Sequence, residues 1–221
     1  MKRIKAVLWD MDGTVLDTLE DLTDSVNKVL DDNGFPKATQ SQIRARVGNG
    51  SLMLIKRCLP EDVSEADLDR IHSQYREYYR AHLLVKTHPY DGIPELIARL
   101  KAAGIKNAVV SNKPHASTKK LANDVFGDLF DFVTGQRAGI PKKPSKYMVQ
   151  YALDKMGVPA ENAAFIGDSE VDVKTAINSG VRGIAVTWGF RDVGQLTAAG
   201  AKLVAKDPVE LERLILGEAD Q

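Results

Sequence analysis

The 221-residue sequence predicts an α/β protein, with a doubly wound parallel sheet and an α-helical insertion. After about residue 93, short apolar runs typical of buried strands alternate with helical patterns, as in a parallel sheet covered on both faces. A similar apolar run, Ala6–Trp9, lies near the N-terminus and must belong to the same sheet. Residues 19–82 lie between these two parts and show helical spacing without a strand pattern, so we expect them to form the insertion.

The insertion is predicted to contain four helices, because apolar residues recur at helical spacing and glycine or proline ends the segments. The expected ranges of the first three helices are residues 19–30, 41–47 and 51–59. The fourth follows a capping signal at Ser64 and Asp67 and continues to about His82. The stretch Gly48-Asn49-Gly50 separates the second helix from the third.

The rest of the chain is predicted to alternate between strands and helices. The expected strands span residues 107–110, 130–134, 163–166, 183–186 and 203–204. The expected helices span residues 93–103, 114–125, 145–156, 171–179 and 209–216. We therefore expect residues 1–16 and 86–221 to form the core and residues 17–85 to form a helical cap.

Composition excludes several classes of partner. Lysine and arginine together number 30, as do aspartate and glutamate, so the formal net charge is zero. Proteins that bind nucleic acid or membrane surfaces through bulk charge carry a basic excess, so we expect neither partner. The single cysteine, Cys58, fits a reducing compartment. No signal peptide and no apolar run long enough to span a bilayer are evident, so we expect a cytoplasmic protein.

Two carboxylates directly follow the first predicted strand. Asp10 and Asp12 stand one residue apart, before Gly13 and Thr14. Acids at the carboxyl end of a parallel strand lie at the edge where open α/β sheets bind ligands. Like charges about 4 Å apart repel by roughly 4 kcal/mol at an effective dielectric constant near 20. A cation must offset this repulsion, or one acid must be held protonated, although a simple turn would also use these residue types.

Three other polar stretches follow strands or precede helices of the predicted sheet. They are Ser111-Asn112, Lys142-Lys143-Pro144 and Gly167-Asp168-Ser169-Glu170-Val171-Asp172. Each alone is also typical of helix caps and solvated loops. Together they would bring a hydroxyl, a cation and further acids to the edge that carries Asp10 and Asp12.

This combination resembles the haloacid dehalogenase superfamily of phosphotransferases. Asp10-Met11-Asp12-Gly13-Thr14 is similar to its DxDGT signature, and Ser111, Lys143 and Gly167-Asp168-Ser169 with Asp172 match its second, third and fourth motifs. The resemblance implies a Rossmann-like core with an inserted C1-type helical cap. Residues 47–55 and the turn Trp188-Gly189-Phe190 look most like phosphoglycolate phosphatases.

Two positions depart from the superfamily's common pattern. Trp9 stands where phenylalanine is usual, and Ser145-Lys146 replaces a frequent second proline after Lys-Pro. The second departure leaves open whether Lys142 or Lys143 faces the phosphate. We expect Lys143, because it directly precedes Pro144.

The resemblance implies a role for each motif residue. Asp10 would attack phosphorus, and Asp12 would act as general acid and base. Mg²⁺ would be held by the carboxylates of Asp10 and Asp168 and by the main-chain carbonyl of Asp12. Asp172 would contact the metal through a water molecule or support the direct ligands. The residues expected to bind or support the phosphoryl group are Lys143, Ser111, Asn112, Gly13 and Thr14.

The function expected from this resemblance is Mg²⁺-dependent hydrolysis of a phosphomonoester through an aspartyl-phosphate. The expected substrate is the small acid 2-phosphoglycolate, with Gly48, Asn49 and Gly50 of the cap near its carboxylate. Inorganic pyrophosphatase, sugar-phosphate phosphatase and phosphomutase are alternatives in the same superfamily. A receiver-like signalling module is a non-enzyme alternative, but such modules are far shorter and lack a cap. We expect a small phosphorylated metabolite as the ligand and a monomer or homodimer.

Overall fold

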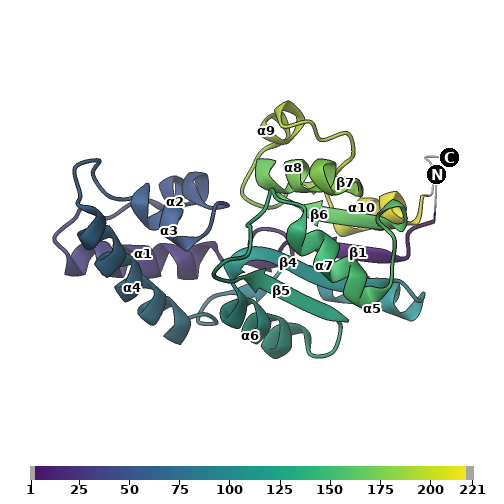
Figure 1. The fold of residues 1–221 in the computed structure, drawn as a ribbon, viewed down its shortest axis with the longest axis horizontal. Coiled ribbons are helices and arrows are strands. Elements are labelled where there is room, and N and C mark those ends of the chain that lie inside the picture. The colour runs from purple at the N-terminus through teal and green to yellow at the C-terminus, as the bar shows by residue number, and fades with distance from the viewer. Residues whose placement is uncertain (1–2, 218–221) are drawn as a thin grey trace.

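A computed structural model describes residues 3–217 as two bodies that lie side by side (Figure 1). In the larger body, the described residues form a six-stranded sheet in the order β5-β4-β1-β6-β7-β8, with every neighbouring pair parallel. The strands are β1 (Ala6–Trp9), β4 (Lys106–Pro114), β5 (Phe132–Gln136), β6 (Ala163–Gly167), β7 (Arg182–Val186) and β8 (Val204–Ala205). The short β1 is therefore central, and its carboxyl end is flanked by those of β4 and β6.

Helices cover both faces of this sheet. Val7 and Trp9 of β1 pack in one apolar cluster with α5 (Ile93–Ala102), α6 (His115–Phe126) and α10 (Pro208–Leu216). The alternate residues Ala6 and Leu8 pack in a second cluster with α7 (Tyr147–Met156) and α8 (Glu170–Ser179). Side chains of a strand point alternately to opposite faces, so these two clusters identify a doubly wound sheet. The fold class predicted from the sequence is confirmed.

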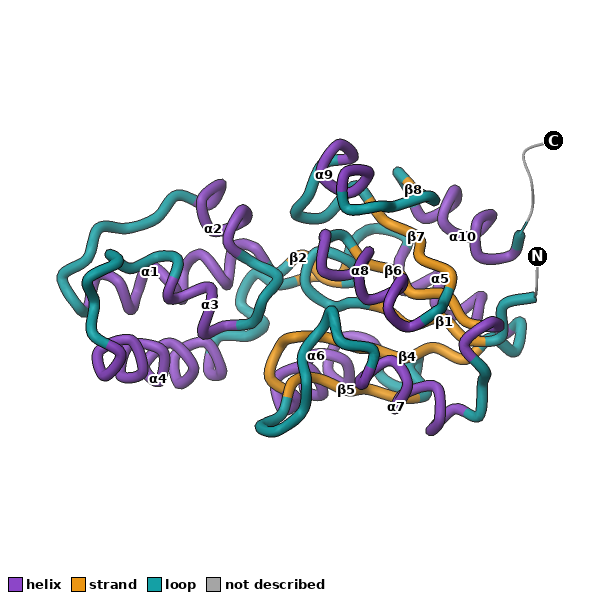
Figure 2. Tube along the Cα trace, turned by 45° about the horizontal axis from the view of Figure 1, so that its top comes forward, coloured by secondary structure: helices purple, strands orange, loops and turns teal. Residues whose placement is uncertain are grey.

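The smaller body consists of four helices and their loops. Figure 2 shows no strand within it. The helices are α1 (Leu19–Asp32), α2 (Gln40–Arg46), α3 (Ser51–Lys56) and α4 (Glu65–Ala81). Buried Val26, Ile43, Ile55, Ile71 and Tyr75 give this body an apolar interior. We refer to these helices and the loops between them as the cap.

The two connections between the cap and the sheet lie next to each other. β2 (Leu16–Asp17) and β3 (His88–Pro89) form a short antiparallel pair. Beside it, the buried carboxylate of Asp21 accepts hydrogen bonds from the backbone N–H groups of residues 85–87. These hydrogen bonds hold α1 to the segment that leads from the cap back to the sheet. The boundaries of residues 17–85 stay a prediction.

The structure differs from the predicted elements at β4 and at four short elements, two of which are the β2 and β3 strands described above. β4 continues to Pro114, so Ser111 and Asn112 lie within the strand instead of ending it. Its pairing with β5 is irregular between Val110 and Pro114 and resumes there, and a local pattern does not reveal this long-range pairing. The helix α9 (Val193–Ala198) and the turn η1 (Ala160–Asn162) were not predicted, because they span too few residues to show a period. No helix within residues 3–217 is long and apolar enough to cross a membrane.

Candidate active site

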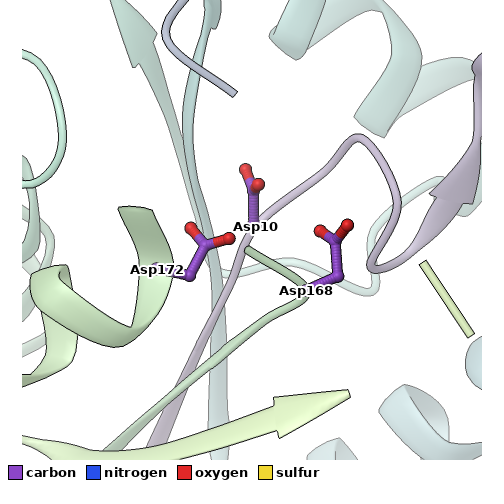
Figure 3. A group of neighbouring side chains, drawn as sticks. All are labelled: Asp10, Asp168 and Asp172. Atoms are coloured by element: carbon purple, nitrogen blue, oxygen red, sulfur yellow. The ribbon is translucent and has the colours of Figure 1, made fainter. Parts of the chain in front are cut away.

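Three carboxylates meet at the carboxyl edge of the sheet (Figure 3). Asp10 follows β1, Asp168 follows β6 and Asp172 lies in the first turn of α8. One carboxylate oxygen from each of the three lies within 4.8 Å of the other two. The structure therefore brings together Asp10, Asp168 and Asp172, three of the residues that were expected at this edge of the sheet.

The proximity of these acids disfavours their charged forms. Burial raises the pKa of Asp10 to about 6, with Asp172 adding to this shift and Lys143 opposing it. Burial raises the pKa of Asp168 well above its usual range, and the charges of Asp172 and Asp10 raise it further. A buried carboxyl with a raised pKa is stabilised in its charged form by a nearby cation. This edge of the sheet therefore favours the binding of positive charge.

Lys143 supplies one such charge from within the protein. Its Nζ lies 2.8 Å from Asp10 Oδ1 and 2.7 Å from Asp172 Oδ1, and only 1% of its side chain is exposed. Burial lowers the pKa of Lys143, but the two carboxylates outweigh that effect and raise it above its ordinary value. Lys142 lies elsewhere, with its Nζ 3.6 Å from the position that a Cβ on Gly50 would take. Of the two adjacent lysines, Lys143 is the one that faces the acids.

The remaining acids are held in place by hydrogen bonds. Asp168 accepts one from the Thr14 hydroxyl at 3.0 Å and one from the Phe190 N–H at 2.7 Å. Asp172 pairs with Lys143 through Oδ1 and accepts hydrogen bonds from the N–H and hydroxyl of Ser169 through Oδ2. Thr14 therefore orients Asp168, and both oxygens of Asp172 are engaged by Lys143 and Ser169.

The acidic site fits a small divalent cation. Asp10 Oδ1 is buried and, apart from its ion pair with Lys143, has no hydrogen-bond partner among the described residues. Carboxylate oxygens are the ligands that Mg²⁺ prefers, and one or two from the protein are usual. At Gly13 and Gly189 an added Cβ would lie 2.4 Å from Asp168 atoms, so the backbone packs directly against this carboxylate. These observations support a metal held by Asp10 and Asp168.

A cavity of about 450 Å³ lies between this edge of the sheet and the cap. Asp10, Asp12, Asp168 and Ser111 line it from the core, and the cap closes it from the opposite side. The cap residues that line it are Leu22, Val47, Gly48, Gly50, Ser51, Leu54, Ser73, Tyr75, Arg76, Glu77, Tyr79 and Arg80. A small ligand in this cavity would contact both bodies.

Asn112 connects the cap loop to the core without offering its side chain to a ligand. Its Nδ2 donates hydrogen bonds to the carbonyls of Gly48 and Lys143, each at 3.1 Å, and its Oδ1 accepts one from the Lys143 N–H at 2.8 Å. The predicted phosphate contact at Asn112 would therefore come from the backbone. The amide instead fixes Lys143 and the position of the cap loop.

The structure separates Asn49 from its two glycine neighbours. Gly48 and Gly50 line the cavity, but Asn49 does not. The Asn49 side-chain carbonyl accepts a hydrogen bond of 2.8 Å from Arg57 of the cap. The expectation that Asn49 lies near a substrate carboxylate is not supported by this arrangement, because Arg57 holds the amide within the cap.

Sequence reasoning missed Lys113. This lysine follows Ser111-Asn112 on β4, and its Nζ lies 2.8 Å from Asp12 Oδ1. It also donates a hydrogen bond to the hydroxyl of Tyr79 from α4. The unbroken polar run at the end of an apolar strand is the signal that could have identified Lys113. Its burial among these partners requires the tertiary structure.

Sequence reasoning also missed two arginines that join cap and core. Arg44 of α2 donates hydrogen bonds to the carbonyls of Gly189 and Phe190. Arg191, which is buried, donates in return to the carbonyls of Arg44 and Val47. These contacts anchor the cap beside the loop that positions Asp168.

Comparisons with known proteins agree with the geometry. The family model for haloacid dehalogenase-like hydrolases matches residues 7–186. A phosphoglycolate phosphatase from Chromobacterium violaceum is 30% identical over 220 residues, which cover 97% of this chain and 98% of that protein.

Solved structures extend the comparison. A candidate phosphoglycolate phosphatase from Lactobacillus delbrueckii subsp. bulgaricus is 35% identical with a TM-score of 0.94, covering 98% of this chain and 100% of its own. CbbY from Rhodobacter sphaeroides, in complex with phosphate, is 26% identical with a TM-score of 0.78, covering 94% and 96% of the two chains. A mutant of CbbY is in complex with xylulose-(1,5)bisphosphate. The chain therefore belongs to the haloacid dehalogenase-like hydrolases, as a phosphatase most similar to phosphoglycolate phosphatases.

Proposed function

We propose that this protein hydrolyses 2-phosphoglycolate in a Mg²⁺-dependent reaction, through an aspartyl-phosphate on Asp10. The observation that carries the proposal is the placement of Asp10 and Asp12 in one cavity beside Lys143 and Asp168. The names of the similar phosphoglycolate phosphatases support the choice of substrate. The cap covers the cavity, which supports a substrate that is enclosed between the two bodies.

The two aspartates would divide the chemistry into two steps. In the first, an Asp10 oxygen attacks phosphorus while the bond to the ester oxygen breaks, and Asp12 gives its proton to that oxygen. In the second, Asp12 takes a proton from water, the water oxygen bonds to phosphorus, and the Asp10 carboxylate leaves. The products are glycolate and inorganic phosphate. Two aspartates with different partners, Lys143 and Lys113, suit two different roles.

Negative charge in this site needs compensation. A phosphate dianion approaching Asp10 would be repelled by Asp10, Asp12 and Asp168. Lys143 offsets part of this charge, and the Ser111 hydroxyl can donate a hydrogen bond to a phosphoryl oxygen. Bound Mg²⁺, held by Asp10 and Asp168, would supply further positive charge next to the phosphoryl group.

A substrate panel tests the proposed function. Purified protein with Mg²⁺ is assayed for phosphate release from 2-phosphoglycolate, pyrophosphate, hexose phosphates, nucleotides and p-nitrophenyl phosphate. The highest kcat/KM is expected for 2-phosphoglycolate. No release from any of these esters would reject the phosphatase assignment, and a preference for pyrophosphate or hexose phosphates would reject the substrate alone.

Metal removal gives a second test. EDTA is expected to abolish activity, added Mg²⁺ to restore it, and Ca²⁺ to inhibit it. Ca²⁺ takes more oxygen ligands at longer distances than Mg²⁺, so it can bind both oxygens of a carboxylate that must attack. Phosphate release is measured after chelation and again after each metal is added. Full activity after thorough chelation would contradict the assignment of Asp10 and Asp168 as metal ligands.

The cap loop gives a third test. Gly48 and Gly50 have φ angles of +125° and +88°, and both line the cavity. Replacing both with valine is expected to lower kcat/KM for 2-phosphoglycolate far more than for p-nitrophenyl phosphate, because the loop would no longer close over the small substrate.

Gly34→Val is a matched control for backbone strain. Gly34 also belongs to the cap and has a φ angle of +73°, but an added Cβ would meet no atom within 4 Å. Its substitution is expected to leave the ratio of the two kcat/KM values unchanged. An equal loss on both substrates in the Gly48 and Gly50 variant would show that the loop does not select the substrate.

A sugar-phosphate phosphatase is the second candidate function. It is favoured by the similarity to CbbY, whose mutant is in complex with a sugar bisphosphate. The substrate panel separates the two candidates, because a hexose or pentose phosphate would then give the highest kcat/KM. The cytoplasmic location and the oligomeric state stay predictions.

A further inference from the structure

Lys113 is a buried lysine that lines the cavity and does not belong to the four sequence motifs. Only 3% of its side chain is exposed, yet it belongs to the residues that line the cavity. Its Nζ lies 2.8 Å from Asp12 Oδ1, donates to the Tyr79 hydroxyl and lies 4.5 Å from the centre of the Tyr79 ring. Burying an ammonium group is costly unless anions offset it. The burial of Lys113 therefore suggests a role beyond packing.

The two buried lysines of the site lie next to different acids. Lys143 contacts Asp10 and Asp172, on the side where the phosphoryl group and the metal would bind. Lys113 contacts Asp12, on the side where the leaving group would depart. Lys113 is therefore the buried lysine next to the acid that would protonate the leaving group.

The chemistry of phosphoglycolate fits this position. The ester oxygen that Asp12 would protonate is separated from the carboxyl carbon of glycolate by a single methylene. A leaving group hydrogen-bonded to Asp12 therefore places its carboxylate close to the Asp12 side chain, within reach of an ammonium only 2.8 Å from it. An ammonium–carboxylate contact is a charge-assisted hydrogen bond, which is stronger than a neutral one.

We propose that Lys113 binds the carboxylate of the leaving group and thereby selects small phosphorylated acids over uncharged phosphate esters. This inference rests on the proposed function. It assigns to the core a contact that the sequence placed at Asn49 of the cap. Tyr79 completes the subsite, because its hydroxyl comes from α4 and orients Lys113 only when cap and core are together.

A comparison of two substrates tests the inference. Ethyl phosphate resembles 2-phosphoglycolate in size but lacks the carboxylate, so the ratio of their kcat/KM values measures what the carboxylate contributes. In Lys113→Met this ratio is expected to fall about 10- to 100-fold, the range of one hydrogen bond to a charged group. Some loss on both substrates is expected as well, because Lys113 also contacts Asp12.

Lys119→Met is the matched control, because Lys119 is an exposed lysine on the neighbouring helix α6. In this variant, the ratio of kcat/KM for 2-phosphoglycolate to kcat/KM for ethyl phosphate is expected to equal that of the unmodified protein. Lys113→Gln keeps a polar side chain against Asp12 and Tyr79, and it covers the case in which the methionine variant does not fold. Its ratio is expected to fall in the same direction.

The outcomes separate this inference from the proposed function. The unmodified protein alone tests the function: if it does not prefer 2-phosphoglycolate to ethyl phosphate, the substrate assignment fails and the inference fails with it. If that preference exists but both Lys113 variants lose activity equally on the two substrates, only the inference is overturned. Lys113 would then serve to position Asp12 and would not bind the substrate.

Discussion

Asp10→Asn is expected to reduce phosphate release to the background rate and to prevent covalent phosphorylation of the protein. An amide is a far weaker nucleophile than a carboxylate. Asp172, the other carboxylate next to Lys143, has both oxygens engaged by Lys143 and Ser169. Asp10, Asp168 and Asp172 are close carboxylates that repel one another. Because the substitution removes one of them, we do not expect it to destabilise the fold. Phosphate release from 2-phosphoglycolate and from p-nitrophenyl phosphate measures the effect.

Asp62→Asn is the control for this substitution. Asp62 is an exposed aspartate between α3 and α4, so the same chemical change there is expected to leave kcat unchanged. Circular dichroism establishes that both variants are folded. A near-native rate in Asp10→Asn would exclude Asp10 as the nucleophile.

Asp12→Asn is expected to lower kcat by roughly 10²- to 10⁴-fold, the usual contribution of general acid–base catalysis. The loss should be smallest for p-nitrophenyl phosphate, because p-nitrophenolate is a good leaving group and needs little protonation. The hydrolysis of the phosphoenzyme should still be slowed for every substrate, since Asp12 would also take the proton from water. The measurement is a comparison of kcat on 2-phosphoglycolate and on p-nitrophenyl phosphate. Equal rates in variant and parent on 2-phosphoglycolate would show that another group transfers the proton.

The main parts of the fold were predictable from the sequence because their signals are local. The buried run Ala6–Trp9 and the alternation after residue 93 follow from side-chain periodicity, and they correctly predicted a parallel sheet with helices on both faces. Polar residues next to strand ends predicted that Asp10, Asp168 and Asp172 would meet, because the carboxyl ends of parallel strands share one edge.

Other features depend on tertiary contacts, which a local pattern does not reveal. Lys142 and Lys143 are chemically identical neighbours, and the expectation of Lys143 came from the position of Pro144. The contacts of Lys143 with Asp10 and Asp172 show that it faces the acids. Lys113 was missed because its partners, Asp12 and Tyr79, are distant in the sequence. Asn49 was placed at the ligand by its glycine neighbours, but the contact with Arg57 directs its amide elsewhere.

The central claim is that Asp10 carries the phosphoryl group during turnover. The most direct measurement is mass spectrometry of protein mixed with Mg²⁺ and 2-phosphoglycolate, quenched with acid within the turnover time and digested into peptides. We expect an acid-stable, base-labile phosphoryl group on the peptide that contains Asp10, and its absence from Asp10→Asn. A phosphoryl group on any other residue, or turnover without any phosphoenzyme even in Asp12→Asn, would contradict the account.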